Sequence, residues 1–308
     1  MEFDFDDDVF DSPKIRTQIS ETCYNAKICT PEWFLSAAGK DTEEQLLLAK
    51  HKADYEYYRC DYANALESYT RCLALVPKSN TAVQRDCVEG KARCCLKLGK
   101  TGEALQCAKE LESLASNCDH RVALWMMLTE IHHLAANTCE EMAALCRCVL
   151  VRPWTSELWY RLSQCYLSQA SSVANGISLP SSALMAGASL IRTRFLYQGS
   201  MSGHRSFGRV QNLKRQDEVQ RLIDDLNLPP DFIELALEEL HKEDDGNKDL
   251  ERDDEQGSLA LLTMTSAEIV STVEKRWFSW VKHTPSSLQG MCQTELLQDL
   301  KLQTVHDS

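Results

Sequence analysis

The segments Trp125-Met126-Met127-Leu128-Thr129 and Trp159-Tyr160-Arg161-Leu162-Ser163 decide the fold that this sequence predicts. In each, a tryptophan is followed three residues later by leucine and four residues later by a hydroxyl residue, which is the spacing of one face of a helix. The two tryptophans stand 34 residues apart. A fixed spacing of this length is typical of stacked helical hairpins.

Segments with small residues at regular positions lie upstream of the two tryptophan segments. Ala65 and Ala104 belong to such segments, and Gly99 marks a tight turn before the second of them. Small side chains let two helix backbones approach closely, while rings such as Tyr69 and Tyr166 fill the space between neighbouring hairpins. The pattern therefore predicts paired helices that stack along the chain.

These segments resemble the tetratricopeptide-repeat (TPR) family, whose 34-residue units each form a helix–turn–helix. The resemblance implies an all-α fold: a TPR-like solenoid of helical hairpins with extra C-terminal helices and disordered acidic segments. We expect about four units, near residues 46–78, 85–115, 122–154 and 156–197, with an insertion around 78–86 and an irregular stretch at 171–182.

The resemblance also implies a binding surface, because the first helices of TPR units line a concave groove. Mixed charges and aromatic residues at these positions suit a protein partner that presents a peptide or a helix, and we expect neither a small-molecule substrate nor a cofactor. Members that bind chaperone tails have Lys followed one turn later by Asn, whereas Lys50 is followed by Asp54, so we do not expect a chaperone adaptor. The predicted groove residues are Lys50, Asp54, Tyr57, Arg93, Lys97, Met126, Glu130, Tyr160, Arg161 and Gln164.

The negative charge of the chain is concentrated in two segments. The formal net charge of −13 argues against a protein that wraps DNA or coats an anionic membrane. Residues 1–11 hold six acidic residues and no base, and residues 238–255 hold ten acidic residues against three bases. Because such segments bury too little apolar area to fold alone, we expect disorder in the N-terminal arm and at 242–257.

A basic stretch lies between these acidic segments. Residues 192–221 carry seven Arg or Lys residues against two acidic residues. A solvated linker is one interpretation. The alternative is a self-masked regulatory module, in which the acidic segments occupy this basic stretch until phosphorylation or a partner releases them. Nucleic-acid binding is not expected, because the stretch has few aromatic residues to stack on bases and no recognised motif.

Helices are also expected outside the repeats. Thr30-Pro31 predicts the start of a short helix that packs on the first unit, and Pro229-Pro230 predicts another helix start. The pattern Thr265-x-x-Glu268 is a capping box before an apolar stripe that includes Trp277 and Trp280. This stripe could dock on the repeats or in a partner's groove, so Trp277 and Trp280 are candidate partner-binding residues.

The expected organisation has six parts. They are an acidic arm (1–29), a short packing helix (30–40), the TPR-like repeat array (41–198), a basic linker with two helices (199–241), a disordered acidic linker (242–257) and C-terminal amphipathic helices (258–308).

No catalytic or metal-binding motif stands out in the sequence. A P-loop, a dinucleotide-binding glycine run, His-Glu-x-x-His and Gly-x-Ser-x-Gly are all absent, so we expect a non-catalytic scaffold or adaptor. The fourteen cysteines include no Cys-x-x-Cys. The best ligand set is Cys139, Cys146, Cys148 and His132-His133, which we interpret as buried core side chains rather than a metal site.

Two further observations bear on location. The amino terminus has neither a basic region nor an apolar run, and no stretch approaches the roughly 20 apolar residues that span a bilayer. We therefore expect a protein of the cytoplasm or nucleus that is neither secreted nor transmembrane.

Overall fold

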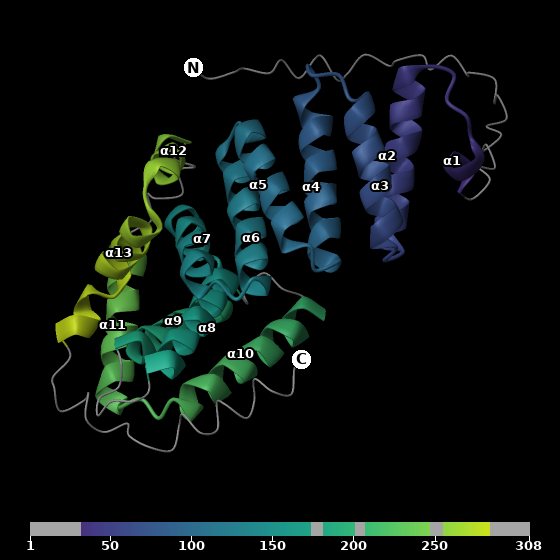
Figure 1. The fold of residues 1–308 in the computed structure, drawn as a ribbon. Helices are drawn as coiled ribbons and strands as arrows, with labels where there is room; N and C mark the ends of the chain where they lie inside the picture. Colours follow the sequence, from purple (N-terminus) through teal and green to yellow (C-terminus); the bar gives the residue numbers. More distant parts are fainter. Residues whose placement is uncertain (1–31, 174–180, 201–206, 247–254, 284–308) are drawn as a thin grey trace, which may run out of the picture.

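Four helical hairpins follow one another from Thr42 to Gly199. The computed structural model describes residues 32–173, 181–200, 207–246 and 255–283 (Figure 1). Within these ranges the regular structure is helical and there is no strand, so the predicted all-α fold is confirmed. The hairpins are α2 (Thr42–Tyr58) with α3 (Tyr62–Leu75), α4 (Thr81–Lys97) with α5 (Thr101–Leu114), α6 (Cys118–Leu134) with α7 (Thr138–Val151), and α8 (Ser156–Val173) with α9 (Ser181–Gly199).

The hairpins repeat at a longer interval than the tryptophans do. Trp125 is the eighth residue of α6, whereas Trp159 is the fourth residue of α8, so the two side chains differ by about one helical turn in position. The 34-residue spacing is therefore not the structural repeat, and the predicted insertion at 78–86 is wrong because α4 already begins at Thr81. Counted from the starts of α2, α4, α6 and α8, successive hairpins are 39, 37 and 38 residues apart.

The first three hairpins share one turn. Each has three residues between its helices, and the central residue has positive φ: Cys60 (62°), Gly99 (70°) and Ala136 (52°). The backbone N–H of the residue after it donates to a carbonyl five residues earlier, as when Asn137 donates to His132. This is a Schellman-type ending, in which a left-handed residue satisfies the last carbonyls of the first helix.

Close contact between helices depends on small residues, as the sequence predicts. Ala65, Ala104 and Cys72 are fully buried. Gly90 of α4 lies so near Tyr69 of α3 that an added Cβ would come within 2.4 Å of the ring. Side chains from α4 to the C-terminal end of the described chain form one large apolar core, and a smaller cluster joins α2, α3 and α4.

The remaining helices fold back on the later hairpins rather than extending the row. They are α10 (Phe207–Asp225), α11 (Pro230–Gly246), α12 (Glu255–Thr263), α13 (Ser266–Trp277) and the 3-10 helix η3 (Ser279–His283). Helices α10 and α11 pack on α9, α12 packs on α6 and α7, and α13 packs along α7 (Figure 1). We call α8 to η3 the C-terminal block.

Two predicted linkers are partly or largely helical. The basic stretch lies in α9 and α10, apart from residues 201–206, which lie outside the described residues. The segment 242–257, predicted to be disordered, is helical at both ends, since α11 continues to Gly246 and α12 begins at Glu255. Burial of Phe232 and Leu240 anchors α11, and Ser258 of α12 is buried, so packing overrides the polar composition there. Residues 247–254 are outside the described ranges.

Among the described residues, a short helix packs at the amino-terminal end of the array. Helix α1 (Trp33–Ser36) follows Glu32, and its Phe34 ring lies 5.5 Å from the Tyr55 ring of α2. The predicted cap at Thr30-Pro31 and the predicted acidic arm lie outside the described residues. Among the helices that are described, none combines the length and apolar character needed to cross a bilayer.

Candidate functional site

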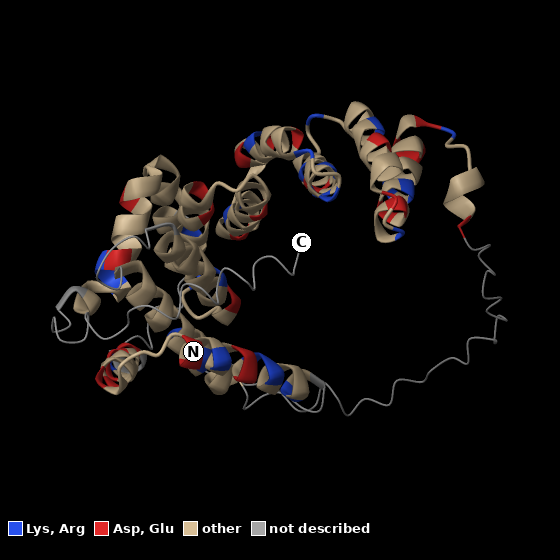
Figure 2. Ribbon diagram, turned by 60° about the horizontal axis from the view of Figure 1, so that its bottom comes forward, with Lys and Arg blue, Asp and Glu red and all other residues tan. Residues whose placement is uncertain are grey.

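The first helices of the hairpins form the candidate binding surface. Helix α2 contacts α4, and α4 contacts α6, whereas the second helices α3, α5 and α7 make less contact with one another. A row of helices that is closer on one side bends toward that side, so α2, α4 and α6 lie on the inner side of the bend. Figure 2 shows the helices as an open arc, with acidic and basic residues interspersed along it. We call the exposed and half-buried side chains of α2, α4, α6 and α8 the first-helix wall.

Arg93 lies at the centre of this wall. Its guanidinium donates two hydrogen bonds to Glu89 Oε1, at 3.0 and 2.7 Å. Burial lowers the pKa of Arg93, but the hydrogen bond and the charge of Glu89 outweigh burial and raise it. Tyr57 of α2 and Glu130 of α6 raise that pKa further. Side chains from three successive hairpins therefore face one region, which is what a peptide-binding surface requires.

The first hairpin presents tyrosines to this region. The Tyr57 ring lies 6.1 Å from the Tyr58 ring and 5.5 Å from the Tyr62 ring, in edge-to-face geometry. Tyr58 is 84% exposed. Exposed tyrosines are common anchors for protein partners, because they combine a large apolar ring with a hydroxyl group.

Two predicted groove residues of α2 are engaged within their own hairpin. Lys50 Nζ lies 2.7 Å from Asp54 Oδ2, and Tyr69 of α3 donates a hydrogen bond to Asp54 Oδ1 at 2.7 Å. Burial, followed by the contact with Asp54, raises the pKa of Tyr69 well above its usual range. Lys50 and Asp54 therefore fix α2 on α3, and their polar groups are only partly available to a partner.

The predicted residues of the later hairpins differ in exposure. Met126 is half-buried against the core, while Glu130 is exposed. Tyr160 donates a hydrogen bond to Glu218 of α10 at 3.2 Å, and burial, reinforced by Glu218, raises the pKa of Tyr160 to about 12. Because α10 covers Tyr160, this residue is not a free part of the wall. Of the other predicted residues, Arg161 is half-buried, and Lys97 and Gln164 are exposed.

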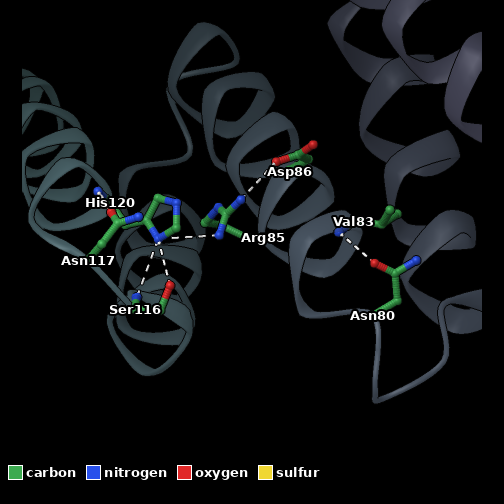
Figure 3. Close-up of polar contacts among 7 residues, drawn as sticks. All are labelled: Asn80, Val83, Arg85, Asp86, Ser116, Asn117 and His120. Atoms are coloured by element: carbon green, nitrogen blue, oxygen red, sulfur yellow. Dashed lines mark hydrogen bonds and ion pairs between the residues drawn. The ribbon is translucent and has the colours of Figure 1, made fainter. Parts of the chain in front are cut away.

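A polar contact that sequence reasoning missed joins α4 to the start of α6 (Figure 3). Arg85 donates toward His120 Nδ1 at 3.3 Å, and the backbone N–H of Ser116 donates to the same nitrogen at 3.3 Å. Since Nδ1 accepts both bonds, the ring carries its proton on Nε2. Arg85 precedes Glu89 and Arg93 at intervals of four residues, so the i, i+4 spacing of one helix face could have revealed it.

The C-terminal tryptophans dock on the protein's own hairpins. Trp277 of α13 is buried, and its ring lies 5.2 Å from the Trp159 ring at an angle of 85°. Trp280 is half-buried, with its Nε1–H donating to the Trp277 carbonyl and its ring 5.2 Å from Phe232. That Trp277 and Trp280 bind a partner stays a prediction, and both rings lie against the protein's own helices. The other possibility that the sequence left open, docking on the repeats, is the one observed.

A buried arginine lies beside these tryptophans. The Arg192 guanidinium of α9 lies 4.4 Å from the centre of the Trp159 ring and 5.6 Å from that of Trp277. Its side chain is 5% exposed, and its Nη1 lies 2.7 Å from Glu243 Oε2 of α11. Arg192 thus belongs to the core, not to a solvated basic stretch. Burial lowers its pKa, and Glu243 opposes that effect.

Polar contacts hold α12 and α13 on the third hairpin. Arg121 donates to Ser258 Oγ at 3.0 Å, and Arg147 donates to the Met264 carbonyl at 3.1 Å. Thr265 and Glu268 form the predicted capping box at the start of α13. Helices α12 and α13 pack on α6 and α7, and half of the Arg93 side chain on α4 stays exposed.

The cysteine and histidine set singled out from the sequence forms no metal centre in the described chain. Cys146 and Cys148 are buried, Cys139 is exposed, and His133 pairs with Glu141 at 3.1 Å. Burial raises the pKa of Cys148 to about 12, which keeps this thiol protonated. Across the described ranges, no cluster of three or more His, Cys, Asp or Glu side chains is arranged to hold a metal ion.

The fold places the chain among all-α proteins built from stacked helical hairpins. The chain belongs to a family of unknown function (DUF5588), whose model matches residues 1–183. It is 26% identical over 361 residues to the uncharacterized protein C8orf76 homolog of Rattus norvegicus, with 95% of this chain and 96% of the rat protein covered. It is 24% identical over 370 residues to the uncharacterized protein C8orf76 of Homo sapiens, with the same shares covered. No solved structure matches the chain significantly.

Proposed function

We propose that this protein is a non-catalytic scaffold or adaptor that binds a peptide or helix of a protein partner on its first-helix wall. The observation that carries the proposal is that α4 contacts both α2 and α6, with a half-exposed Arg93 near enough to Tyr57 and Glu130 for both to raise its pKa. Neighbouring repeats that each contribute a side chain suit an extended partner, because a peptide can cross several helices at once.

A TPR-like arrangement is part of this proposal. Four successive hairpins and the buried small residues of their second helices support it. The repeat of 37 to 39 residues is longer than the family's 34 residues, so partner positions cannot be transferred directly from that family. We therefore assign residues to the first-helix wall from their positions in this structure, not from the binding positions of that family.

The wall favours a partner with both charge and apolar surface. Arg93 offers a guanidinium whose hydrogen bonds to Glu89 can be shared with a carboxylate. Tyr58 and Leu134, at the ends of α2 and α6, add exposed apolar area on either side of α4. A segment with an acidic side chain next to aliphatic or aromatic residues would contact Arg93, Tyr58 and Leu134 together.

Selection from a displayed peptide library tests the proposal. The library is selected on the full chain, and the enriched peptides are titrated against wild type and Arg93→Glu by calorimetry. We expect the dissociation constant to rise about tenfold or more in Arg93→Glu, because the substitution removes a charge-assisted contact and adds repulsion.

Arg71→Glu provides the matched control. Arg71 lies on the second helix α3 and pairs with Glu67 four residues earlier, as Arg93 pairs with Glu89 on α4. Both variants thus lose one exposed i, i+4 ion pair, whose effect on stability is small. Enriched peptides that bind Arg93→Glu as tightly as Arg71→Glu would exclude the wall as the binding site.

A further inference from the structure

The first half of α10 is a basic and apolar surface that no described helix covers. Val210 is 51% exposed and Leu213 is 41% exposed. Arg209 and Lys214 lie within about 100° of Val210 around the helix, whereas Arg215 lies nearer the packed side, and residues 207–216 contain no acidic residue. Figures 1 and 2 show this half of α10 projecting beyond α8 and α9 into the open side of the arc. We call Arg209, Val210, Leu213 and Lys214 the α10 patch.

The helix geometry separates the patch from the packed face. At 100° per residue, Val210 and Lys214 lie roughly opposite Val219 and Ile223, which are buried against the rest of the block. Asn212, on the packed side, donates hydrogen bonds to the Tyr197 carbonyl and Ser200 Oγ and so fixes the helix in place. Arg215, outside the patch, pairs with Glu218 at 3.3 Å, whereas Arg209 and Lys214 have no ion pair among the described residues.

We infer that the α10 patch is the docking site of the chain's own residues 1–11. This segment carries six acidic residues and no base, alternating with Phe3, Phe5, Val9 and Phe10. Its charge is opposite to that of the patch, and its apolar side chains match the exposed Val210 and Leu213. The positive end of the α10 dipole adds to the attraction, because the patch lies in the first turns of the helix.

The length of the chain favours this occupant over a free partner. Residues 1–11 lie outside the described residues, which begin at Glu32. The intervening residues, about twenty, can span up to about 70 Å. A tethered segment also has an effective concentration in the millimolar range, which a separate acidic protein rarely reaches. Weak charge complementarity is therefore sufficient for docking within one chain.

The self-masking hypothesis placed the acidic segments on the whole basic stretch 192–221, and we restrict the docking site to α10. Arg192 is buried and paired with Glu243, so it cannot receive the arm. The patch lies on α10 and Arg93 lies on α4, so each is substituted without changing the other and this inference is tested separately from the first-helix wall.

Carbodiimide coupling of the full chain tests the inference. The reagent joins a carboxylate directly to an amine in contact with it, and Lys214 is the lysine of α10. We expect mass spectrometry of the monomer fraction at low ionic strength to show Asp4, Asp6, Asp7 or Asp8 joined to Lys214. The yield should not depend on protein concentration, and it should fall about fivefold or more in 0.5 M salt, where the Debye length is about 4 Å.

Two variants and a control make the test specific. Arg209→Gln with Arg215→Gln keeps the Lys214 amine but removes neighbouring charge, and Val210→Ser with Leu213→Ser removes the apolar contact. Each pair should lower coupling at Lys214 about threefold or more. Lys78→Gln, an exposed cation before α4, should leave coupling at Lys214 unchanged.

A second measurement does not use the α10 variants, so it remains informative if one of them unfolds. Replacing Asp4, Asp6, Asp7 and Asp8 by Asn leaves α10 intact, and it should raise the acetylation rate of Lys214 about threefold without changing that of Lys78. Coupling that favours Lys97 or Lys78, coupling found only in dimers, or an unchanged acetylation rate would each overturn the inference.

Discussion

The first two hairpins and the C-terminal block bury their apolar side chains in different ways. Helices α2 to α5 contact helices one or two places away along the chain. In the block, Trp159 of α8 is covered by Trp277 of α13, and Arg192 of α9 pairs with Glu243 of α11. Damage to a hairpin should therefore stay local, whereas damage to the block should spread to segments distant in sequence.

The largest expected effect comes from Trp277→Ala. Removing this buried ring leaves a cavity beside Trp159 and should lower the free energy of unfolding by about 3–5 kcal/mol, measured by urea denaturation. Hydrogen exchange should show lost protection in α8, α9 and α13, with α2 to α5 unchanged.

Tyr58→Ala is the control for that substitution. Tyr58 is an exposed aromatic residue of the first hairpin, so its loss should change stability by less than about 0.5 kcal/mol. Equal protection losses in α2 to α5 after Trp277→Ala would show that the two regions unfold as one unit, and the contrast between them would then fail.

A smaller effect is expected from Glu243→Gln. The substitution leaves the Arg192 guanidinium buried without its counter-charge, which should cost about 2–3 kcal/mol in the same denaturation experiment. The matched variant is Glu89→Gln, whose partner Arg93 is exposed at the same 2.7 Å separation. That variant should cost less than about 0.5 kcal/mol. Similar costs for the two would mean that Arg192 is solvated.

The smallest effects concern the shared turn of the first three hairpins. Gly99→Ala should cost about 1 kcal/mol, because the left-handed conformation disfavours a Cβ although none of the surroundings would clash with it. Ala136→Gly should gain about 0.5 kcal/mol by relieving the same strain. Thermal denaturation of both variants is the measurement. Changes of the same sign would show that the turns are not equivalent.

The difference between the first two hairpins and the C-terminal block explains which features could be predicted from the sequence. Signals within one hairpin were informative: the small residues Ala65 and Ala104 are buried at helix contacts, and the capping box at Thr265 starts α13. These features depend on neighbours a few residues away, which sequence spacing reports directly.

Long-range features could not be predicted in this way. The burial of Arg192, the cover that α10 places on Tyr160 and the docking of Trp277 all depend on which distant helices meet. The tryptophan spacing was misleading for the same reason: α13 covers Trp159, whereas α12 packs on the helix that carries Trp125, so the two tryptophans need not occupy equivalent positions. Of the candidate site residues, Arg93 and Glu130 were predicted from the sequence to lie on the binding surface. The contact between Arg85 and His120 was not predicted.

The cover that Trp277 gives Trp159 has a consequence for synthesis of the protein. The early hairpins can reach their native contacts as they leave the ribosome, because each needs only a neighbour that has just emerged. Trp159 lacks the cover of Trp277 until the chain as far as α13 has been translated. During that interval the nascent protein exposes apolar surface around Trp159. Chaperones that recognise apolar side chains would bind there.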